Sequence, residues 1–203
     1  MILIYTLGFE EKYVLRGIIN RGIKPEDKIW IIIPKPRNER TDVALNNLRT
    51  IAGKLYGVKI EDFEVPIDDV YEAVSTLRSF FKERMREDKI ALNLSGGMKI
   101  LVLAVLAAVN SLNMECEIDI LREDLAKYYT FPIELFRSMG LDDVDRRILK
   151  ALMNNAKGVS EVARSIGVSK STVWRRLEIL ARKGLVEKKD KRYVITGLGR
   201  SRI

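Results

Sequence analysis

Short runs rich in Ile and Val alternate, over the first 131 residues of this chain, with longer stretches in which apolar residues recur at helical spacing. Strands that are apolar on both faces and alternate with helices are typical of a parallel sheet covered by helices on both sides. The sequence therefore predicts an α/β fold with a mostly parallel, doubly wound sheet. We expect strands at residues 2–6, 28–34, 60–65, 90–94, 115–121 and 127–131, and the longer helices at 41–56, 69–85 and 98–112.

Two loops of this predicted sheet have compositions suited to a ligand. Leu7-Gly8-Phe9 follows the first strand, and residues 95–99 (SGGMK) join the fourth strand to an almost wholly apolar helix. Ligands of open parallel sheets bind outside the carboxyl ends of the strands. Glycines let a ligand approach the backbone, and a helix N-terminus favours an anion, which would also offset the unfavourable placement of Lys99 in a first helical turn. A tight turn with a solvent-directed lysine is the alternative interpretation.

The positive charge of the chain is concentrated in its last third. Residues 141–203 hold 16 Lys and Arg against 7 Asp and Glu, a net charge of +9, whereas residues 1–140 have a net charge of −1. Such asymmetry is typical of a nucleic-acid-binding segment attached to another domain. A solvated surface of a heat-adapted protein is the alternative, but it would spread both signs of charge over both parts.

The pattern of residues 141–203 resembles the winged helix-turn-helix of bacterial and archaeal transcription regulators, most clearly over residues 159–196. Helices at 160–166 and 170–183 flank Gly167 and the predicted N-cap Ser169, and two short strands at 185–188 and 192–196 form the wing. The alternative is a winged helix that serves only protein–protein association. Trp174 is expected to pack in a core or in a dimer contact and not against a DNA base. A recognition helix and wing of this kind would contact double-stranded DNA through Ser169, Lys170, Ser171, Thr172, Arg175, Arg176, Lys188, Lys189, Lys191 and Arg192.

Composition excludes several function classes. The chain has no His and only Cys116, so His-based acid–base catalysis, His/Cys metal sites and intrachain disulfides are not expected. The longest strictly apolar run has ten residues, 100–109, and the N-terminus lacks a signal-peptide pattern. We therefore expect a cytoplasmic protein with no membrane partner, no metal and no cofactor.

Taken together, the two parts resemble the archaeal CRISPR-associated transcriptional regulators of the Csa3 type, which join a CARF domain to a winged helix. The motifs that carry the resemblance are TLGFEEKYVLRGI at residues 6–18 and LNLSGGMKILVLAVLAAV at residues 92–109. The expected organisation is a Rossmann-like CARF domain for ligand sensing and dimerisation at 1–131, a linker at 132–140 and the winged helix at 141–203.

The resemblance also implies a ligand and an assembly. In this family the Rossmann-like domains pair as a homodimer, and the two loops line a two-fold pocket for a cyclic oligoadenylate, usually cyclic tetra-adenylate. One wall would consist of Thr6, Leu7, Gly8 and Phe9, and the phosphate and ribose contacts would come from Ser95, Gly96, Gly97, Met98 and Lys99. The resemblance therefore implies a protein that regulates CRISPR-associated genes, which serve antiviral defence. This regulator would sense the cyclic oligoadenylate and would not be an enzyme.

Two alternatives stay open. Some CARF proteins cleave the ring that they bind, and Lys99 with Ser95 or Thr6 could serve that reaction. The chain could also be a winged-helix regulator with another nucleotide ligand or with none. Arg37 and Arg40 could border the pocket or belong to a solvated loop, and the sequence favours the loop.

Overall fold

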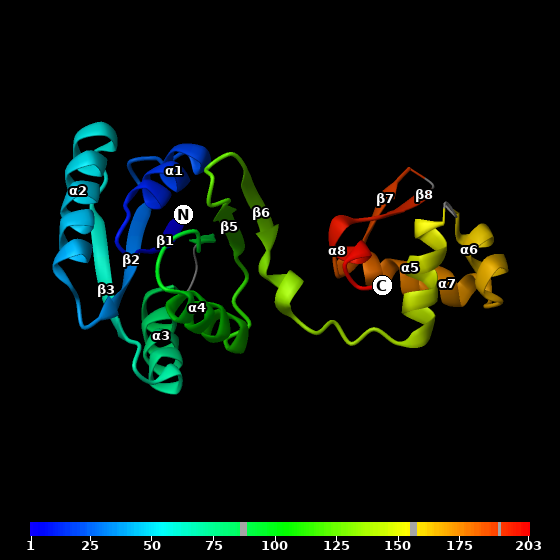
Figure 1. Cartoon of the computed structure of the whole chain (residues 1–203). Helices are drawn as coiled ribbons and strands as arrows, with labels where there is room; N and C mark the ends of the chain where they lie inside the picture. Colours follow the sequence, from blue (N-terminus) through cyan, green and yellow to red (C-terminus); the bar gives the residue numbers. More distant parts are fainter. Residues whose placement is uncertain (86–88, 155–157, 191) are drawn as a thin grey trace. The chain divides into compact units, whose positions relative to one another are not determined.

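The computed structural model describes residues 1–85, 89–154, 158–190 and 192–203 (Figure 1). The chain divides into two compact units, Met1–Ile133 and Glu134–Ile203. Each unit has its own hydrophobic core.

The first unit is built on a six-stranded sheet in the order β3-β2-β1-β4-β5-β6. Neighbouring strands are parallel except for the last pair, β5 and β6, which is antiparallel. The prediction of an α/β fold with a mostly parallel, Rossmann-like sheet is therefore confirmed. The strands are β1 (Ile2–Thr6), β2 (Lys28–Lys35), β3 (Ile60–Pro66), β4 (Ile90–Asn93), β5 (Glu117–Leu121) and β6 (Tyr128–Pro132).

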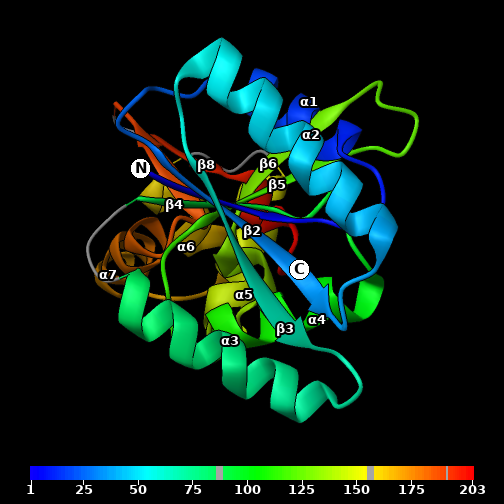
Figure 2. The same ribbon diagram turned by 90° about the vertical axis from the view of Figure 1, so that its left-hand side faces the viewer.

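Helices cover both faces of this sheet (Figure 2). Helices α1 (Lys12–Arg21) and α2 (Glu39–Tyr56) pack on one face, and α3 (Val70–Arg84) and α4 (Lys99–Ser111) pack on the other. The apolar runs of the sequence supply both layers, because alternate residues of β1 and β2 enter opposite cores: Leu3 and Ile31 lie under α1 and α2, whereas Ile4 and Ile32 lie under α3 and α4.

The junction between the two units lies at the end of β6. Ile133 is fully buried in the core of the first unit, and its backbone N–H donates to the carbonyl oxygen of Cys116 at 3.0 Å. The 3-10 helix η1 (Ile133–Phe136) follows directly. In the second unit, Arg202 donates to the carbonyl oxygens of Glu134 and Leu135, and the Lys183 ammonium donates to that of Met139 at 2.7 Å. Residues 134–139 are therefore attached to the second unit.

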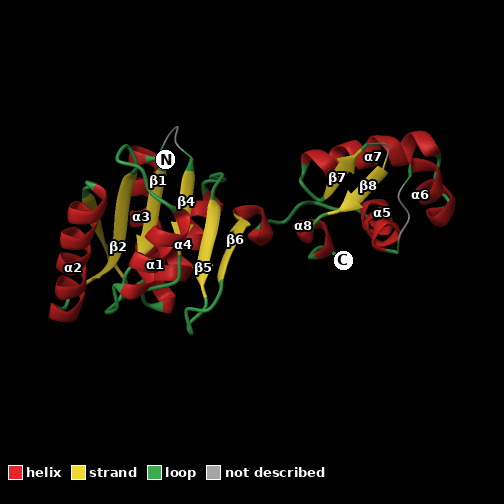
Figure 3. Cartoon of the chain, turned by 90° about the horizontal axis from the view of Figure 1, so that it is seen from above, coloured by secondary structure: helices red, strands yellow, loops and turns green. Residues whose placement is uncertain are grey.

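The second unit contains three helices followed by an antiparallel strand pair, the arrangement of a winged helix (Figure 3). Its elements are α5 (Asp143–Met153), α6 (Val159–Ile166), α7 (Lys170–Arg182), β7 (Val186–Lys189), β8 (Arg192–Ile195) and the short α8 (Gly197–Arg200). Asp142 caps α5 in a capping box with Asp145, and Gly167, which the sequence placed between two helices, ends α6 in the left-handed conformation.

The sequence placed most of these elements within two residues of their ends but did not predict η1 or α8. Both are single turns, which are too short to produce a helical period. No helix in the described residues combines the length and the apolar composition that crossing a bilayer requires.

Candidate functional site

The loops after β1 and β4 lie at the point where the strand order of the sheet reverses. The chain runs outward from β1 through β2 to β3, and it returns to β4 on the other side of β1. The loops that follow these two strands therefore lead to helices on opposite faces, α1 and α4, and a crevice opens between them. The sequence predicted these two loops, but the strand order that makes them neighbours is a finding of the structure.

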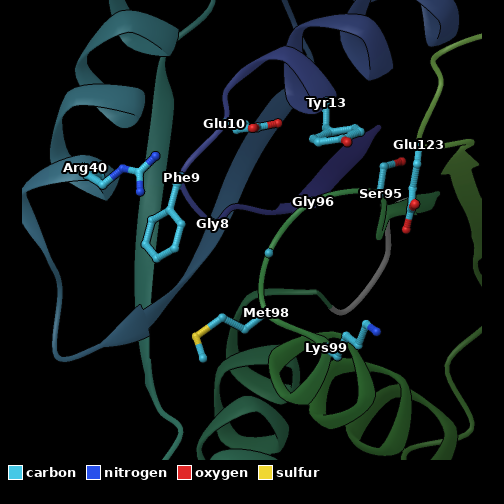
Figure 4. A pocket seen from close by; sticks show the side chains of 11 residues that line it. Gly8, Phe9, Glu10, Tyr13, Arg40, Ser95, Gly96, Met98, Lys99 and Glu123 are labelled. Carbon is cyan, nitrogen blue, oxygen red and sulfur yellow. The ribbon is translucent and has the colours of Figure 1, made fainter.

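A pocket of about 490 Å³ occupies this crevice (Figure 4). The loop after β1, the loop after β4, the first turns of α1, α2 and α4, and the turn between β5 and β6 all contribute to it. The lining residues are Gly8, Phe9, Glu10, Tyr13, Arg40, Ser95, Gly96, Gly97, Met98, Lys99 and Glu123.

Thr6 and Leu7, which the sequence assigned to the wall of the pocket, are buried beneath it and do not line it. Leu7 has no exposed surface and packs in the core under α1 and α2. The Thr6 hydroxyl donates to the Gly96 carbonyl oxygen at 2.6 Å, and so links the two loops. Both residues support the pocket from behind.

The glycines of the two loops are required mainly by the close approach of the two loops. A Cβ on Gly8 would lie 3.3 Å from the Gly97 Cα, and one on Gly96 would lie 2.9 Å from the Thr6 carbonyl oxygen. Gly97 has a φ of +87°, a region that side-chain-bearing residues rarely adopt. The small residues therefore let the two loops pack backbone against backbone, in addition to leaving room for a ligand.

Ser95 is held in place by its neighbours in the sheet. Its N–H donates to the side-chain oxygen of the buried Asn93 at 3.2 Å, and its hydroxyl accepts from the Leu121 N–H at 2.8 Å. Among the described residues the hydroxyl has no recorded acceptor, so its proton can be donated to a ligand.

Asn93 belongs to a row of polar residues that crosses the sheet beneath α1. The strand register places Tyr5, Asn93, Asp119 and Thr130 side by side on consecutive strands. Asp119 accepts from the Thr130 hydroxyl at 2.7 Å and from Arg21 at 3.1 Å, while burial raises the pKa of Tyr5 well above its ordinary value. This row fixes the strands under the pocket.

The N-terminus of α4 opens onto the pocket without a side-chain cap. Met98 occupies the N-cap position and makes no side-chain cap hydrogen bond, and the exposed Lys99 is the first residue of the helix. The first four backbone N–H groups at such an end have no intrahelical acceptor, and the helix dipole adds partial positive charge there. An anion bound in the pocket would be attracted by both the backbone and Lys99.

Four lining residues were not among the predicted site residues: Glu10, Tyr13, Arg40 and Glu123. Tyr13 lies inside the motif at residues 6–18 and in the first turn of α1, directly after the loop that carries Phe9, and this place in the sequence could have indicated it. Glu123 comes from the turn between β5 and β6, which no local pattern connects to the other loops.

The structure separates the two arginines that follow β2. Arg37 makes ion pairs with Asp42, Asp62 and Glu64 at 3.3, 2.6 and 2.6 Å, away from the pocket. Arg40 lines the pocket, with its guanidinium carbon 5.0 Å from the centroid of the Phe9 ring. The loop interpretation was therefore wrong for Arg40.

A second candidate surface lies on α7 and the wing. Lys170, Ser171 and Arg175 are exposed on α7, and Trp174 between them is 54% exposed, so it does not pack in the core. Val173, Leu177 and Leu180 form the buried face of the same helix. Exposed cations and one exposed indole thus share the outward face of α7.

Three predicted DNA-contacting side chains of α7 are also engaged inside the unit. The Ser169 hydroxyl accepts from the Thr172 N–H at 3.2 Å and lies 2.9 Å from the Thr172 hydroxyl, so both serve the N-cap. Arg176 points toward the start of α5, where it pairs with Asp142 at 2.6 Å and with the buried Asp145 at 3.4 Å.

The wing presents Lys188, Lys189 and Arg192 to solvent, while the predicted Lys191 lies outside the described residues. Its base is attached to α7 by Glu178, which accepts from the Tyr193 hydroxyl at 2.7 Å and lies 3.5 Å from the Lys188 ammonium. The Tyr193 hydrogen bond lowers the pKa of Glu178, whereas burial and the same bond raise the pKa of Tyr193 to about 12.

In the described residues, no three side chains from His, Cys, Asp and Glu come together in a way that could hold a metal ion.

Comparison with protein families gives one match for each part of the chain. Residues 1–132 match the family model of the Csa3 CRISPR-associated Rossmann-like domain. Residues 142–202 match that of the HVO_A0261 N-terminal domain.

The chain is also similar to individual proteins. It is 22% identical over 198 residues to Csa3 of Saccharolobus solfataricus. That protein is named as a CRISPR locus-related DNA-binding protein. The alignment covers 92% of this chain and 79% of that protein. Among solved structures, protein VC1899 of Vibrio cholerae aligns with a TM-score of 0.49 and 11% identity. Can2 of Sulfobacillus thermosulfidooxidans, solved in complex with cyclic tetra-adenylate, aligns with 0.48 and 9%. Each alignment covers 99% of this chain, which spans 63% of the first protein and 62% of the second, less than two thirds of either.

Proposed function

The chain belongs to the family of Csa3 CRISPR-associated Rossmann-like domains, and from this membership we propose that it is a dimeric, DNA-binding transcriptional regulator of CRISPR-associated genes whose pocket binds a cyclic oligoadenylate. We take cyclic tetra-adenylate as the ligand, bound without a cofactor at residues 8–9 and 95–99. The regulator would respond to the ligand by a change in its affinity for DNA.

The observation that carries this proposal is the pocket at the reversal point of the sheet. It combines an uncapped helix N-terminus with Lys99 and Arg40, which suit phosphates, and it offers the exposed side chains of Phe9 and Met98, which suit bases. A phosphodiester ring with purine bases needs both kinds of contact.

An apolar stripe on α4 supports the dimer. Leu103 is 59% exposed, and Val102 and Leu106 are half-buried on the same helix, which begins at the pocket. We propose that a second copy of this chain covers the stripe, because pairing there places the two pockets close to a common two-fold axis. A ring with two-fold symmetry then meets the same loops from each protomer.

The second unit supports the DNA-binding part of the proposal. Its net charge of +9 lies on a winged-helix fold, and Lys170, Ser171 and Arg175 are exposed at the start of α7. In such modules the first turns of the recognition helix contact base edges and the wing contacts phosphates. Ligand binding can change DNA affinity only by as much as the ligand's own affinity differs between the two conformations of the dimer.

Cleavage of the ring is a second candidate function, because two carboxylates, those of Glu10 and Glu123, line the pocket. A carboxylate could take the proton of a ribose 2′-hydroxyl while that oxygen attacks the adjacent phosphorus. The bond from phosphorus to the 5′-oxygen breaks, the 5′-oxygen takes a proton from solvent, and the linear product ends in a 2′,3′-cyclic phosphate and a 5′-hydroxyl. Incubation of the ring with the protein, followed by chromatography, would reveal linear products. Loss of those products in both Glu10→Gln and Glu123→Gln would support this candidate.

The test of the proposed function is calorimetric titration with cyclic tetra-adenylate, with linear tetra-adenylate as the control ligand. We expect one ring per dimer, and we expect Lys99→Ala to weaken ring binding about 10- to 100-fold, the effect of one charged hydrogen bond. The same variant should bind DNA normally in the absence of ring. A duplex selected by the protein from a random-sequence library serves as the DNA probe.

Two results would contradict the proposal. If the protein does not bind the ring, the ligand assignment fails and a winged-helix regulator with an unassigned pocket is left. If DNA affinity is identical with and without saturating ring, the pocket does not regulate the second unit.

A further inference from the structure

Arg40 is a cation in the pocket that neither its sequence context nor its family resemblance assigns to the ligand. It is the second residue of α2, a helix capped by Asn38, whose side-chain oxygen accepts from the Thr41 N–H at 2.9 Å. α2 otherwise contributes no lining residue, and Arg40 reaches the pocket from the helix end (Figure 4).

Arg40 and Lys99 lie at helix N-termini that differ in their acidic neighbours. The first turn of α2 holds Glu39 and Asp42 beside Arg40, whereas the first turn of α4 holds no acidic residue beside Lys99. Both cations line one pocket, together with the carboxylates of Glu10 and Glu123. An anion bound there would be attracted by both cations and by the N-terminus of α4.

The contact with Phe9 holds the Arg40 side chain at the pocket. The guanidinium carbon lies 5.0 Å from the centroid of the Phe9 ring, and Phe9 is itself 44% exposed in the loop after β1. A stacked guanidinium keeps its N–H groups at its edge, where they remain available to an acceptor. Stacking also restricts the rotamers of a long side chain before a ligand arrives, which reduces the entropy lost on binding.

Arg37, three residues earlier, provides a comparison, because its side chain is held by ion pairs within the protein. The two terminal nitrogens of its guanidinium make ion pairs with three carboxylates. In the described residues Arg40 has no ion pair, and its one recorded contact is the face of an aromatic ring. The two arginines differ in the feature that matters for a ligand, which is the availability of their donors.

We propose that Arg40, stacked on Phe9, is a ligand-binding residue that donates a bidentate pair of hydrogen bonds to a phosphate of the nucleotide ligand. It acts as the second cation of each pocket, opposite Lys99. This inference rests on the proposed function and adds to it a residue that sets affinity and selects ligands with more than one phosphate.

The experiment compares Arg40→Ala and Arg40→Lys with the native protein by calorimetry, with cyclic tetra-adenylate as the probe. We expect Arg40→Ala to weaken binding about 10- to 100-fold and Arg40→Lys to recover only part of the loss, because lysine is a point charge without a planar pair of donors. Lys54→Ala removes an exposed cation from the other end of α2 and should leave binding unchanged.

A double-mutant cycle with Phe9→Leu tests the stacking. If Phe9 positions the guanidinium, Arg40→Ala costs less affinity in the Phe9→Leu background than in the native protein. Equal losses in both backgrounds would overturn the positioning role of Phe9. Thermal unfolding of the ligand-free variants shows whether the fold is intact.

The outcomes separate this inference from the proposed function. Native protein that binds the ring together with Arg40→Ala that binds it equally well overturns this inference alone. Native protein that binds neither the cyclic nor the linear tetra-adenylate overturns both. Full recovery by Arg40→Lys overturns the bidentate contact.

Discussion

Arg175 and Arg176 are adjacent on α7 but do different work in the structure. Arg175 is exposed on the outward face, whereas Arg176 joins Asp142 and the buried Asp145 at the start of α5. The sequence assigned both to DNA because both are cations in the first turns of a recognition helix. The packing of α5 against α7 joins residues more than thirty positions apart, and no local pattern reveals it.

The two arginines should therefore respond differently to substitution. We expect Arg175→Ala to weaken DNA binding with little change in stability, because it removes an exposed cation. Arg176→Ala should lower the free energy of unfolding by about 1–3 kcal/mol, because it leaves the buried Asp145 carboxylate without its cation. Chemical denaturation and binding to the selected duplex, measured on each single variant, check both effects. Equal stability of the two variants would contradict this division.

The residues of the pocket were predictable where they lie in the two motifs and not elsewhere. Seven of the nine predicted ligand residues line the pocket, because they follow strands β1 and β4 directly. Arg40 reaches the pocket from the first turn of α2 and Glu123 from the turn between β5 and β6, whereas Thr6 and Leu7 lie buried beneath it.

At the scale of the elements, the loops after β1 and β4 depend on each other, because their glycines allow the two backbones to pack in direct contact. A methyl group on Gly97 would lie 3.1 Å from the Thr6 Cβ, on a backbone with a φ of +87°. We expect Gly97→Ala to destabilise the first unit by about 1–3 kcal/mol and to weaken ring binding. Thermal unfolding and calorimetry measure the two effects.

Gly53 provides the control for that substitution. It lies within helix α2, and a Cβ there would meet nothing within 4 Å. Gly53→Ala should therefore stabilise the protein by about 0.4–1 kcal/mol and leave ring binding unchanged. A Gly97→Ala variant as stable as the native protein would show that the loops tolerate separation.

The attachment of the wing to α7 predicts a pH dependence. The hydrogen bond from Tyr193 lowers the pKa of Glu178, so its contribution to stability is complete above the ordinary carboxyl range and is lost as pH falls through it. The pKa of Tyr193 is raised to about 12 by burial and by Glu178, so its contribution is complete below pH 10 and is lost as pH rises toward 12.

Tyr193→Phe tests this attachment. Without the phenol hydroxyl, the pKa of Glu178 should move up toward its ordinary value, which an NMR titration of the Glu178 carboxyl carbon measures directly. The wing should also become more mobile, because Lys188 is the remaining recorded partner of Glu178. An unchanged pKa of Glu178 in this variant would show that the hydrogen bond from Tyr193 does not stabilise the Glu178 carboxylate in solution.

For the molecule as a whole, the sequence predicted the class of fold more readily than the arrangement that creates the site. The alternation of apolar runs and helical periods indicated the doubly wound sheet, and the uneven charge indicated a separate basic unit. Strand order was not predictable, because the pairing of β1 with β4 joins Ile2 to Ile90 and depends on long-range packing. That pairing brings the two loops together, so the sequence indicated the parts of the pocket without their juxtaposition.

The proposed dimer gives the last prediction, because the apolar stripe of α4 begins where the pocket ends. Leu103→Glu places a charge at a position that is 59% exposed in the protomer and buried in the proposed dimer. We expect this variant to sediment as a folded monomer and to lose most of its affinity for cyclic tetra-adenylate, since the ring would then meet one set of loops. DNA affinity should fall as well, because two winged helices joined in a dimer bind two half-sites at once.

Ile19 on α1 allows a matched control. It is also 59% exposed but lies on the helix layer of the opposite face of the sheet. Ile19→Glu should therefore remain a dimer and bind both ligands as the native protein does. If Leu103→Glu remains a dimer with native affinity for the ring, the two copies meet elsewhere and the stripe has another role. If the native protein is a monomer even at saturating ring, a pocket shared across a two-fold axis is excluded, and each protomer must bind its ligand with its own loops alone.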